Sequence, residues 1–237
     1  MDSVPASPKR TAEEKKTFLQ IVSDFIRANR VALLAILAGI VIVLVSILVY
    51  TSVRGAVIRT STTRIEKLQD DATAYETEQD QAKKAELETA LIAGLDETAA
   101  KWPKLFAGQK AHALKAGILA AKKDWAGAEA EWLAAAASRP TSYLAPIALQ
   151  EAAVAAEERG SPESAKALYE RFLKEYPNAV SGIPHAHFAL GRLSEDAKDY
   201  VAAIASYEKI VATYPDSDWT KLAKDRILFI NSRGLAK

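Results

Sequence analysis

Two similar stretches decide the fold of this chain: ALYERFLKEYP at residues 167–177 and ASYEKIVATYP at residues 205–215. Both begin with alanine, carry Tyr-Glu at the same place and close on Tyr-Pro, and they lie 38 residues apart. Self-similarity at a fixed period of about 20 to 50 residues indicates supersecondary units stacked on one another. One such unit cannot bury its apolar face alone, so a further copy is expected.

A third copy is present upstream. Each copy consists of an alanine, an aromatic residue four positions later and a proline eight positions beyond that. The three sets are Ala128, Trp132 and Pro140; Ala165, Tyr169 and Pro177; and Ala203, Tyr207 and Pro215. Residues typical of turns and helix N-termini precede each alanine, and each proline is a helix stop signal. Each unit is therefore predicted to be a pair of helices.

The residue types fit close packing of two helices. An alanine at a helix crossing lets the backbones approach, and the aromatic residue one turn later fills the gap to the neighbouring pair. On the first helix of the third unit, Leu190 and Gly191 supply the matching small residue. Ala153 and Ala116 stand in place of that glycine in the second and first units.

This pattern resembles the tetratricopeptide repeat, in which Leu-Gly, alanine, an aromatic residue and proline recur at the same offsets. The resemblance covers roughly residues 109–217, and it is closest in the third unit and most distant in the first. It implies an α-solenoid of about three helix pairs that presents a surface to protein partners. An alanine-rich helical bundle with coincidental prolines is the alternative.

Composition agrees with an all-α fold. Alanine, leucine, lysine and glutamate are abundant, and no segment after residue 60 alternates apolar and polar residues as a strand does. The net charge is +1 and no basic stripe is interleaved with aromatic residues, so no nucleic-acid partner is expected. The chain has no cysteine, which excludes disulfides, thiolate catalysis and a lipidated cysteine anchor.

The run VALLAILAGIVIVLVSILVY at residues 31–50 contains no charged residue. At about 1.5 Å of rise per residue, a helix of this length spans a hydrocarbon core of about 30 Å. A signal peptide has a shorter apolar region of about 7 to 15 residues, and no convincing small-residue cleavage site follows this run. We therefore expect a permanent single-pass transmembrane helix that contacts membrane lipid through residues 31–50.

Positive charges near the span do not settle its orientation. Six lysine and arginine residues precede it and four lie in the eighteen residues after it, but the eighteen residues before it also hold four. A short charged tail, one span and a repeat domain resemble the bacterial inner-membrane proteins typified by the ancillary subunit of the Sec translocon. That resemblance implies a cytoplasmic tail at residues 1–30 and a repeat domain in the periplasm.

The remaining segments are predicted to be helical as well. We expect residues 51–108 to form a stalk with at most a short coiled coil; within them, residues 86–103 either cap the array or form a further degenerate repeat. Residues 109–237 are the predicted repeat domain, closed by a C-terminal amphipathic helix that caps the last unit. Before the span, an apolar stripe either lies at the membrane interface or begins the anchor helix. Its members are Phe18, Ile21, Val22 and Phe25.

No catalytic or cofactor-binding motif is found in the sequence. The histidines are His112, His185 and His187, and the last two would point roughly 200° apart on a helix, with no carboxylate pair to complete a metal site. Glycine-rich phosphate loops, nucleophile elbows and metalloprotease helices are missing. We expect a protein that is not an enzyme and needs no metal, cofactor or small-molecule substrate.

Binding of other proteins is the function that the repeats imply. In a stack of helix pairs the first helices line the concave side, and equivalent positions recur from unit to unit. The candidate partner-binding residues there are Gln150, Val154 and Glu157 in the second unit, and Phe188, Arg192 and Glu195 in the third. The same stripe of the first unit holds only the small residues Ala113, Gly117 and Ala120. Alternatively, these side chains pack within their own helix pair.

These observations predict a membrane-anchored scaffold at the bacterial inner membrane. The resemblance implies translocase subunits or periplasmic chaperones as protein partners. A cytoplasm-facing adaptor with the same repeats, and a coordinator of cell division or of the cell envelope, are the alternatives.

Overall fold

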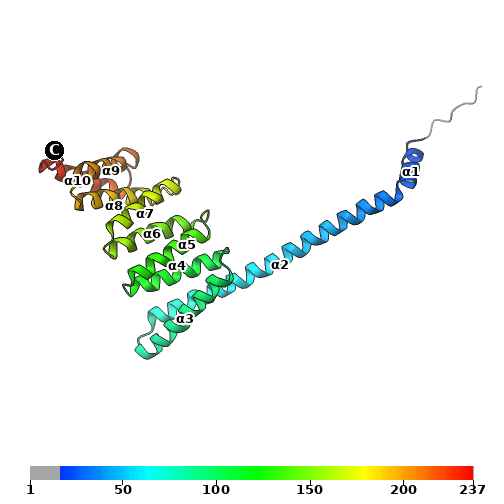
Figure 1. Cartoon of the computed structure of the whole chain (residues 1–237), viewed down its shortest axis with the longest axis horizontal. Helices are drawn as coiled ribbons and strands as arrows, with labels where there is room; N and C mark the ends of the chain where they lie inside the picture. Colours follow the sequence, from blue (N-terminus) through cyan, green and yellow to red (C-terminus); the bar gives the residue numbers. More distant parts are fainter. Residues whose placement is uncertain (1–16, 237) are drawn as a thin grey trace, which may run out of the picture. The chain divides into compact units, whose positions relative to one another are not determined.

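The computed structural model describes residues 17–236, and in this part of the chain every regular element is an α-helix (Figure 1). The helices are α1 (Phe18–Ala28), α2 (Arg30–Thr77), α3 (Gln81–Lys101), α4 (Phe106–Ala121), α5 (Trp125–Ser138), α6 (Leu144–Glu158), α7 (Pro162–Glu175), α8 (Ile183–Asp196), α9 (Tyr200–Thr213) and α10 (Asp218–Ser232). The all-α prediction is confirmed for the described residues. The predicted tail at residues 1–30 lies mostly outside them.

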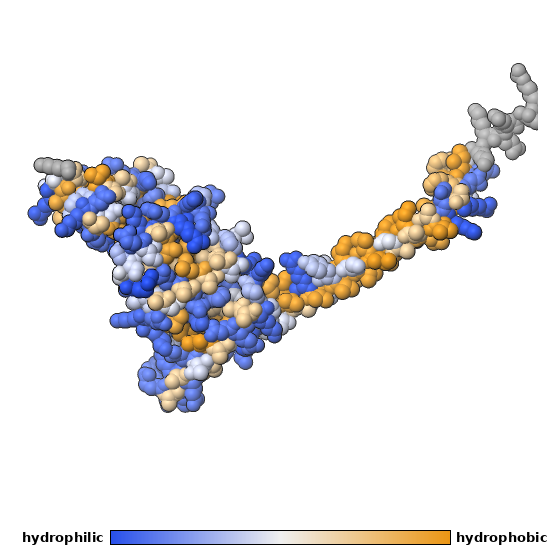
Figure 2. Space-filling model, in the orientation of Figure 1, coloured by the Kyte–Doolittle hydropathy of each residue, from blue (hydrophilic) through white to orange (hydrophobic). Residues whose placement is uncertain are grey.

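The chain divides into two compact units, Met1–Ala56 and Val57–Lys237. The first unit holds α1 and the N-terminal part of α2. The long helix α2 is apolar and long enough over its first half to cross a membrane, by length and composition. Nearly all of its large apolar side chains from Val31 to Val53 are exposed in the structure, and Figure 2 shows a continuous apolar surface along this part of the helix. Within the first unit these side chains are not packed into a core.

The second unit begins with a helical hairpin, made by the C-terminal part of α2 and by α3. Its core contains Ile65 and Leu68 of α2 and Leu91 and Leu95 of α3, each at most 2% exposed. Asp80 caps the N-terminus of α3 by accepting hydrogen bonds from the backbone N–H groups of the second and third helical residues. The predicted stalk at residues 51–108 thus includes two helices that pack on each other. The boundaries predicted for the stalk and the repeat domain stay a prediction.

Three helix pairs follow in chain order: α4 with α5, α6 with α7, and α8 with α9, with α10 packed on the last pair (Figure 1). Each pair turns through one residue with positive φ, namely Lys123 (62°), Gly160 (74°) and Lys198 (62°). This left-handed conformation suits glycine best, so two of the three turns place a lysine in a conformation that L-residues rarely adopt. The aspartates Asp124 and Asp199 then cap α5 and α9.

The structure buries the small residues of the repeated pattern. Ala128, Ala165 and Ala203 are fully buried, as are the rings of Tyr169 and Tyr207, whereas Trp132 is only partly buried. The prolines Pro140, Pro177 and Pro215 are exposed just beyond the ends of α5, α7 and α9. Leu190 is buried on α8, and a Cβ atom added to Gly191 would lie 2.4 Å from the ring of Tyr207. Glycine at this position therefore lets the tyrosine approach the backbone of α8.

Candidate protein-binding surface

Helices α6, α8 and α10 are joined by side-chain contacts, α6 to α8 and α8 to α10, and form a common surface. It is called here the α6/α8/α10 face, and it comprises Ile147, Gln150, Val154 and Glu157 of α6; His185, Phe188, Arg192 and Glu195 of α8; and Trp219, Leu222 and Arg226 of α10. Residues three or four apart lie on one side of a helix, so each of these sets forms a stripe. All six partner-binding residues predicted from the sequence belong to this face.

Two polar contacts join α6 to α8. The side-chain amide Nε2 of Gln150 lies 2.7 Å from Nδ1 of His185, and an Arg192 guanidinium nitrogen donates a hydrogen bond to Glu157 Oε2. Burial lowers the pKa of His185 below its usual range, so the ring is neutral at neutral pH. A neutral ring can accept the amide hydrogen of Gln150 at Nδ1. The structure therefore brings four of the face residues together in pairs.

An aromatic cluster joins α8 to α10. The ring centroids of His185 and Phe188 lie 4.9 and 5.1 Å from that of Trp219, within the range of favourable aromatic contacts. Phe188 also lies 5.3 Å from the ring of Tyr207, which belongs to the core of the third pair. Phe188 therefore contacts Tyr207 of its own pair as well as Trp219 of the next helix.

A tyrosine, a glutamate and an arginine recur as a set. Tyr169 donates to Glu157 Oε1 over 2.7 Å and Tyr207 donates to Glu195 Oε1 over 2.6 Å. Arg226 donates to Glu195 Oε1 over 2.9 Å, and Arg192 likewise donates to Glu157. Each glutamate therefore ties the second helix of its own pair to the first helix of the next.

The electrostatic shifts follow from these contacts. Burial, together with the hydrogen bond to a carboxylate, raises the pKa of Tyr169 and of Tyr207 above the usual range, so both hydroxyls stay protonated and remain donors. Burial acts to raise the pKa of Glu195, but the hydrogen bonds from Arg226 and Tyr207 outweigh it and hold that pKa below its usual range. The glutamate is therefore an ionised acceptor at neutral pH.

Four residues of the face leave part of their side chain open to solvent. Ile147 and Leu222 are 48% and 46% exposed, and the side chains of Arg192 and Arg226 are 48% and 41% exposed. Aromatic and arginine side chains are enriched among the residues that contribute most to protein interfaces, and apolar side chains form the core of such interfaces when they become buried. This arrangement suits contact with another protein.

Five residues of the face are not among those predicted from the sequence, namely Ile147, His185, Trp219, Leu222 and Arg226. From the sequence, His185 is considered only as a possible metal ligand, and the C-terminal helix that carries Trp219, Leu222 and Arg226 is considered only as a cap. The spacing of Trp219, Leu222 and Arg226 by three and four residues was the signal available, because it matches the stripes on α6 and α8.

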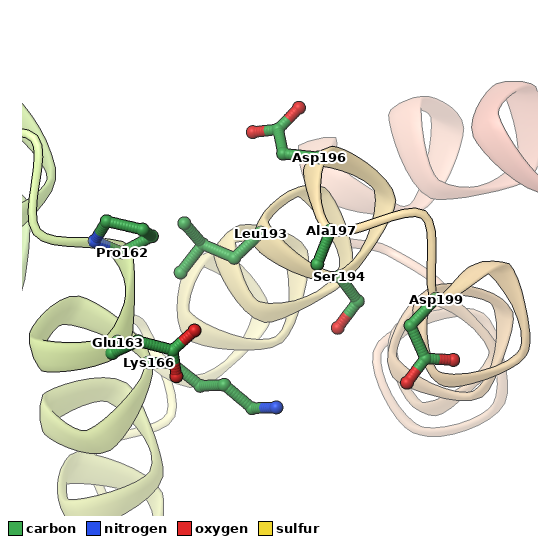
Figure 3. A pocket seen from close by; sticks show the side chains of 8 residues that line it. All are labelled: Pro162, Glu163, Lys166, Leu193, Ser194, Asp196, Ala197 and Asp199. Atoms are coloured by element: carbon green, nitrogen blue, oxygen red, sulfur yellow. The ribbon is translucent and has the colours of Figure 1, made fainter.

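A separate cavity of about 220 Å³ lies between the start of α7 and the turn from α8 to α9 (Figure 3). Glu163, Lys166, Asp196 and Asp199 are the charged residues that line it. Asp199 already accepts a hydrogen bond from the backbone N–H of Ala202 as the cap of α9. Among residues 17–236, no group of three or more histidine, cysteine or acidic residues is placed to hold a metal ion. This cavity is therefore not proposed as a metal site.

Comparison with known proteins finds similarity to tetratricopeptide repeats. Residues 151–218 match the family model described as tetratricopeptide repeat, and this stretch holds most of the second predicted unit and the third. A TPR repeat-containing protein of Treponema pallidum (strain Nichols) is 34% identical over 150 residues, which cover 62% of this chain. The match spans 61% of the length of that curated relative. No solved structure matches.

Proposed function

We propose that this chain is a membrane-anchored scaffold, not an enzyme, that binds another protein through the α6/α8/α10 face. The observation that carries the proposal is the set of half-exposed apolar and arginine side chains that α6, α8 and α10 place on that one face. The match to tetratricopeptide repeats supports it, because stacked helix pairs of this kind present continuous surfaces for binding.

The N-terminal part of α2 is proposed as the anchor. Its apolar side chains point outward all round the helix, as expected of a segment whose surroundings are hydrocarbon. Arg30 and Arg54 stand at its two ends, about 36 Å apart at the usual rise of an α-helix. This separation fits a hydrocarbon core of about 30 Å flanked by polar headgroups.

The location of the protein and its partner are also proposals. We infer a bacterial inner membrane, with residues 1–30 in the cytoplasm and the repeat units in the periplasm, and translocase subunits or periplasmic chaperones as partners. This inference rests on the resemblance to the ancillary Sec subunit, which shares the order of a short charged tail, one membrane span and a repeat domain. The cytoplasm-facing adaptor and the envelope or division coordinator remain the alternatives.

Site-specific photocrosslinking in intact membranes tests the binding face. A photoreactive residue at Ile147 or at Leu222 should give the same crosslinked protein, because these positions lie on the two outer helices of one face. The same residue placed at Val201, which is 66% exposed on the second helix α9, is the matched control. It should give at least roughly tenfold less of that product.

A second variant separates binding from folding. Leu222→Asp places a charge in the contact surface while leaving the buried core of α10 unchanged, so it should remove the crosslink from Ile147 without lowering the melting temperature. A crosslink that is as strong from Val201 as from Ile147 would show that the partner binds elsewhere.

Labelling of single cysteines tests the orientation, and the absence of native cysteine makes each variant carry one reactive thiol. In intact spheroplasts, a membrane-impermeant maleimide should modify Ala130→Cys on α5 and leave Ser23→Cys on α1 unmodified. The reverse pattern would favour the cytoplasm-facing adaptor.

A further inference from the structure

The helix α1 has one apolar face and one polar face (Figure 2). At about 100° per residue, its six large apolar side chains fall within an arc of about 160° and its four polar ones within an arc of about 100°. The apolar set is Phe18, Leu19, Ile21, Val22, Phe25 and Ile26, and the polar set is Gln20, Ser23, Asp24 and Arg27. No residue of α1 is buried, and Phe18 and Phe25 are 76% and 59% exposed. An apolar face of this extent needs a partner.

The structure separates α1 from the anchor helix. Residue Asn29 leaves the helical conformation, with φ −113° and ψ 17°, and its side-chain amide donates a hydrogen bond to the carbonyl of Phe25 over 3.0 Å. At the other end, Thr17 and Gln20 form a capping box. Both ends are therefore satisfied, and α1 is a helix in its own right, not the first turns of α2.

Continuation of α1 straight into the bilayer does not fit its length or its polarity. One helix from residue 18 to residue 54 would be about 55 Å long, well beyond the hydrocarbon thickness of about 30 Å. It would also place Asp24 and Arg27 in lipid, where charged groups are costly. Of the two alternatives that the sequence leaves open, the structure favours the one in which the stripe is not part of the span.

We propose that α1 lies flat in the headgroup region of the bilayer, with its apolar face toward the acyl chains and its polar face toward water. The proposal rests on the anchor assigned above, because only Asn29 and Arg30 separate α1 from the apolar run that enters the membrane. This continuity makes lipid the occupant of the apolar face. Arg27 and Arg30 would then lie at headgroup depth, where anionic lipid attracts them.

Two adjacent residues provide a matched test. Val22 lies near the centre of the apolar arc and Ser23 lies in the polar arc, yet both are at the same distance from the span. The full chain carrying Val22→Cys or Ser23→Cys is labelled with an environment-sensitive fluorophore and placed in vesicles of phosphatidylcholine and phosphatidylglycerol. Label positions at Ile42, within the span, and at Ala130, on α5, serve as the buried and open references.

The expected result is a difference between the neighbours. Iodide in the aqueous phase should quench the label at Val22 roughly threefold less than the label at Ser23, and nitroxide groups on the lipid chains should show the opposite preference. The change Phe18→Ser with Phe25→Ser should bring iodide access at Val22 up to that at Ser23, while Ile42 stays protected.

Three results would overturn the proposal, and they differ in what they imply. Equal iodide access at Val22 and Ser23 would place α1 wholly in water or wholly in the bilayer. Protection of Val22 without quenching by lipid nitroxides would mean that protein covers the apolar face. Iodide access at Ile42 would refute the anchor itself, and with it the proposed membrane-anchored function.

Discussion

In the second and third helix pairs a buried tyrosine hydroxyl donates to a glutamate, whereas the first pair has Trp132 at the tyrosine position and Ala120 at the glutamate position. The position on α6 that corresponds to the arginine is apolar too, because Val154 stands there. All three members of the polar set are thus present together or absent together. The set behaves as a unit that joins one pair to the next.

The first pair is held by other contacts. Glu131 of α5 lies 2.7 Å from His112 and 2.8 Å from Lys115, both on α4, and Lys115 also pairs with Asp96 on α3 over 2.5 Å. The hydrogen bond from His112 is the largest reason why the pKa of Glu131 lies below its usual range. These contacts join α5 to α4 and α4 to the preceding helix α3, not to the next pair. The difference teaches that the same backbone arrangement tolerates two polar schemes, provided that each carboxylate finds its donors.

The largest expected loss of stability comes from removing a fully buried aromatic ring of the repeated pattern, compared with the partly buried Trp132. Tyr207→Ala should lower the free energy of unfolding by about 3 to 5 kcal/mol, because it empties a fully buried site. Trp132→Ala should have a smaller effect, since Trp132 is only partly buried. Thermal melts of the full chain in detergent provide the measurement. If both variants lost the same free energy of unfolding, the aromatic position would contribute equally in the first and third pairs.

The next effect tests the helix crossing that all pairs share. Ala203→Leu should destabilise the chain by about 1 to 3 kcal/mol, since Ala203 is fully buried and added methylene groups overpack the crossing. The matched change Ala202→Leu should be milder, because Ala202 is only partly buried. If both variants melt at one temperature, the crossing has been assigned to the wrong residue.

Removal of a single hydroxyl addresses the polar set directly. Tyr169→Phe keeps the buried ring but deletes the hydrogen bond to Glu157, which should lower the free energy of unfolding by about 1 to 2 kcal/mol. Tyr176→Phe, on a partly buried ring at the end of α7, is the matched control and should change little. A Tyr169→Phe protein as stable as the parent would show that the hydrogen bond to Glu157 does not contribute to stability.

The smallest effect is a pH dependence. The folded-state pKa of Glu195 lies below its unfolded value of about 4.3, so its contribution to stability is present above that pH and disappears as the pH falls through the folded value. The melting temperature should therefore fall from about pH 5 toward about pH 3, and Glu195→Gln should make that fall shallower. An unchanged slope in the variant would assign the acid sensitivity to other carboxylates.

The sequence was sufficient for the helix pairs because their signals are local. Alanine, an aromatic residue and proline lie within thirteen positions of one another, and a helix brings such residues to one face. The match of residues 151–218 to a repeat family coincides with the two units that follow the pattern best. The left-handed lysines Lys123 and Lys198 were not predictable, because lysine carries no preference for that conformation.

The partners within the candidate site were not predictable for another reason. Arg192 and its partner Glu157 are 35 residues apart in the sequence, whereas Arg226 and Glu195 are 31 residues apart. These sequence separations differ because the connection from α9 to α10 is shorter than that from α7 to α8. A fixed repeat period therefore cannot locate Arg226, and only packing of the helices brings it to Glu195. Whether the six predicted residues contact a partner stays a prediction.

The arrangement of acid and base along α6, α8 and α10 also bears on how such a chain could grow. Helix α8 carries both Arg192 and Glu195, so it can join a neighbour on each side. The position three residues before Glu157 holds Val154, and the position three residues after Arg226 holds Phe229, so α6 and α10 can each join through this polar set on one side only. Duplication of the α8–α9 module would preserve every junction, whereas duplication of either neighbour would leave one unmatched. Duplication of this module would thus lengthen the α6/α8/α10 face from its middle, while α6 and α10 would stay at the two ends of that face.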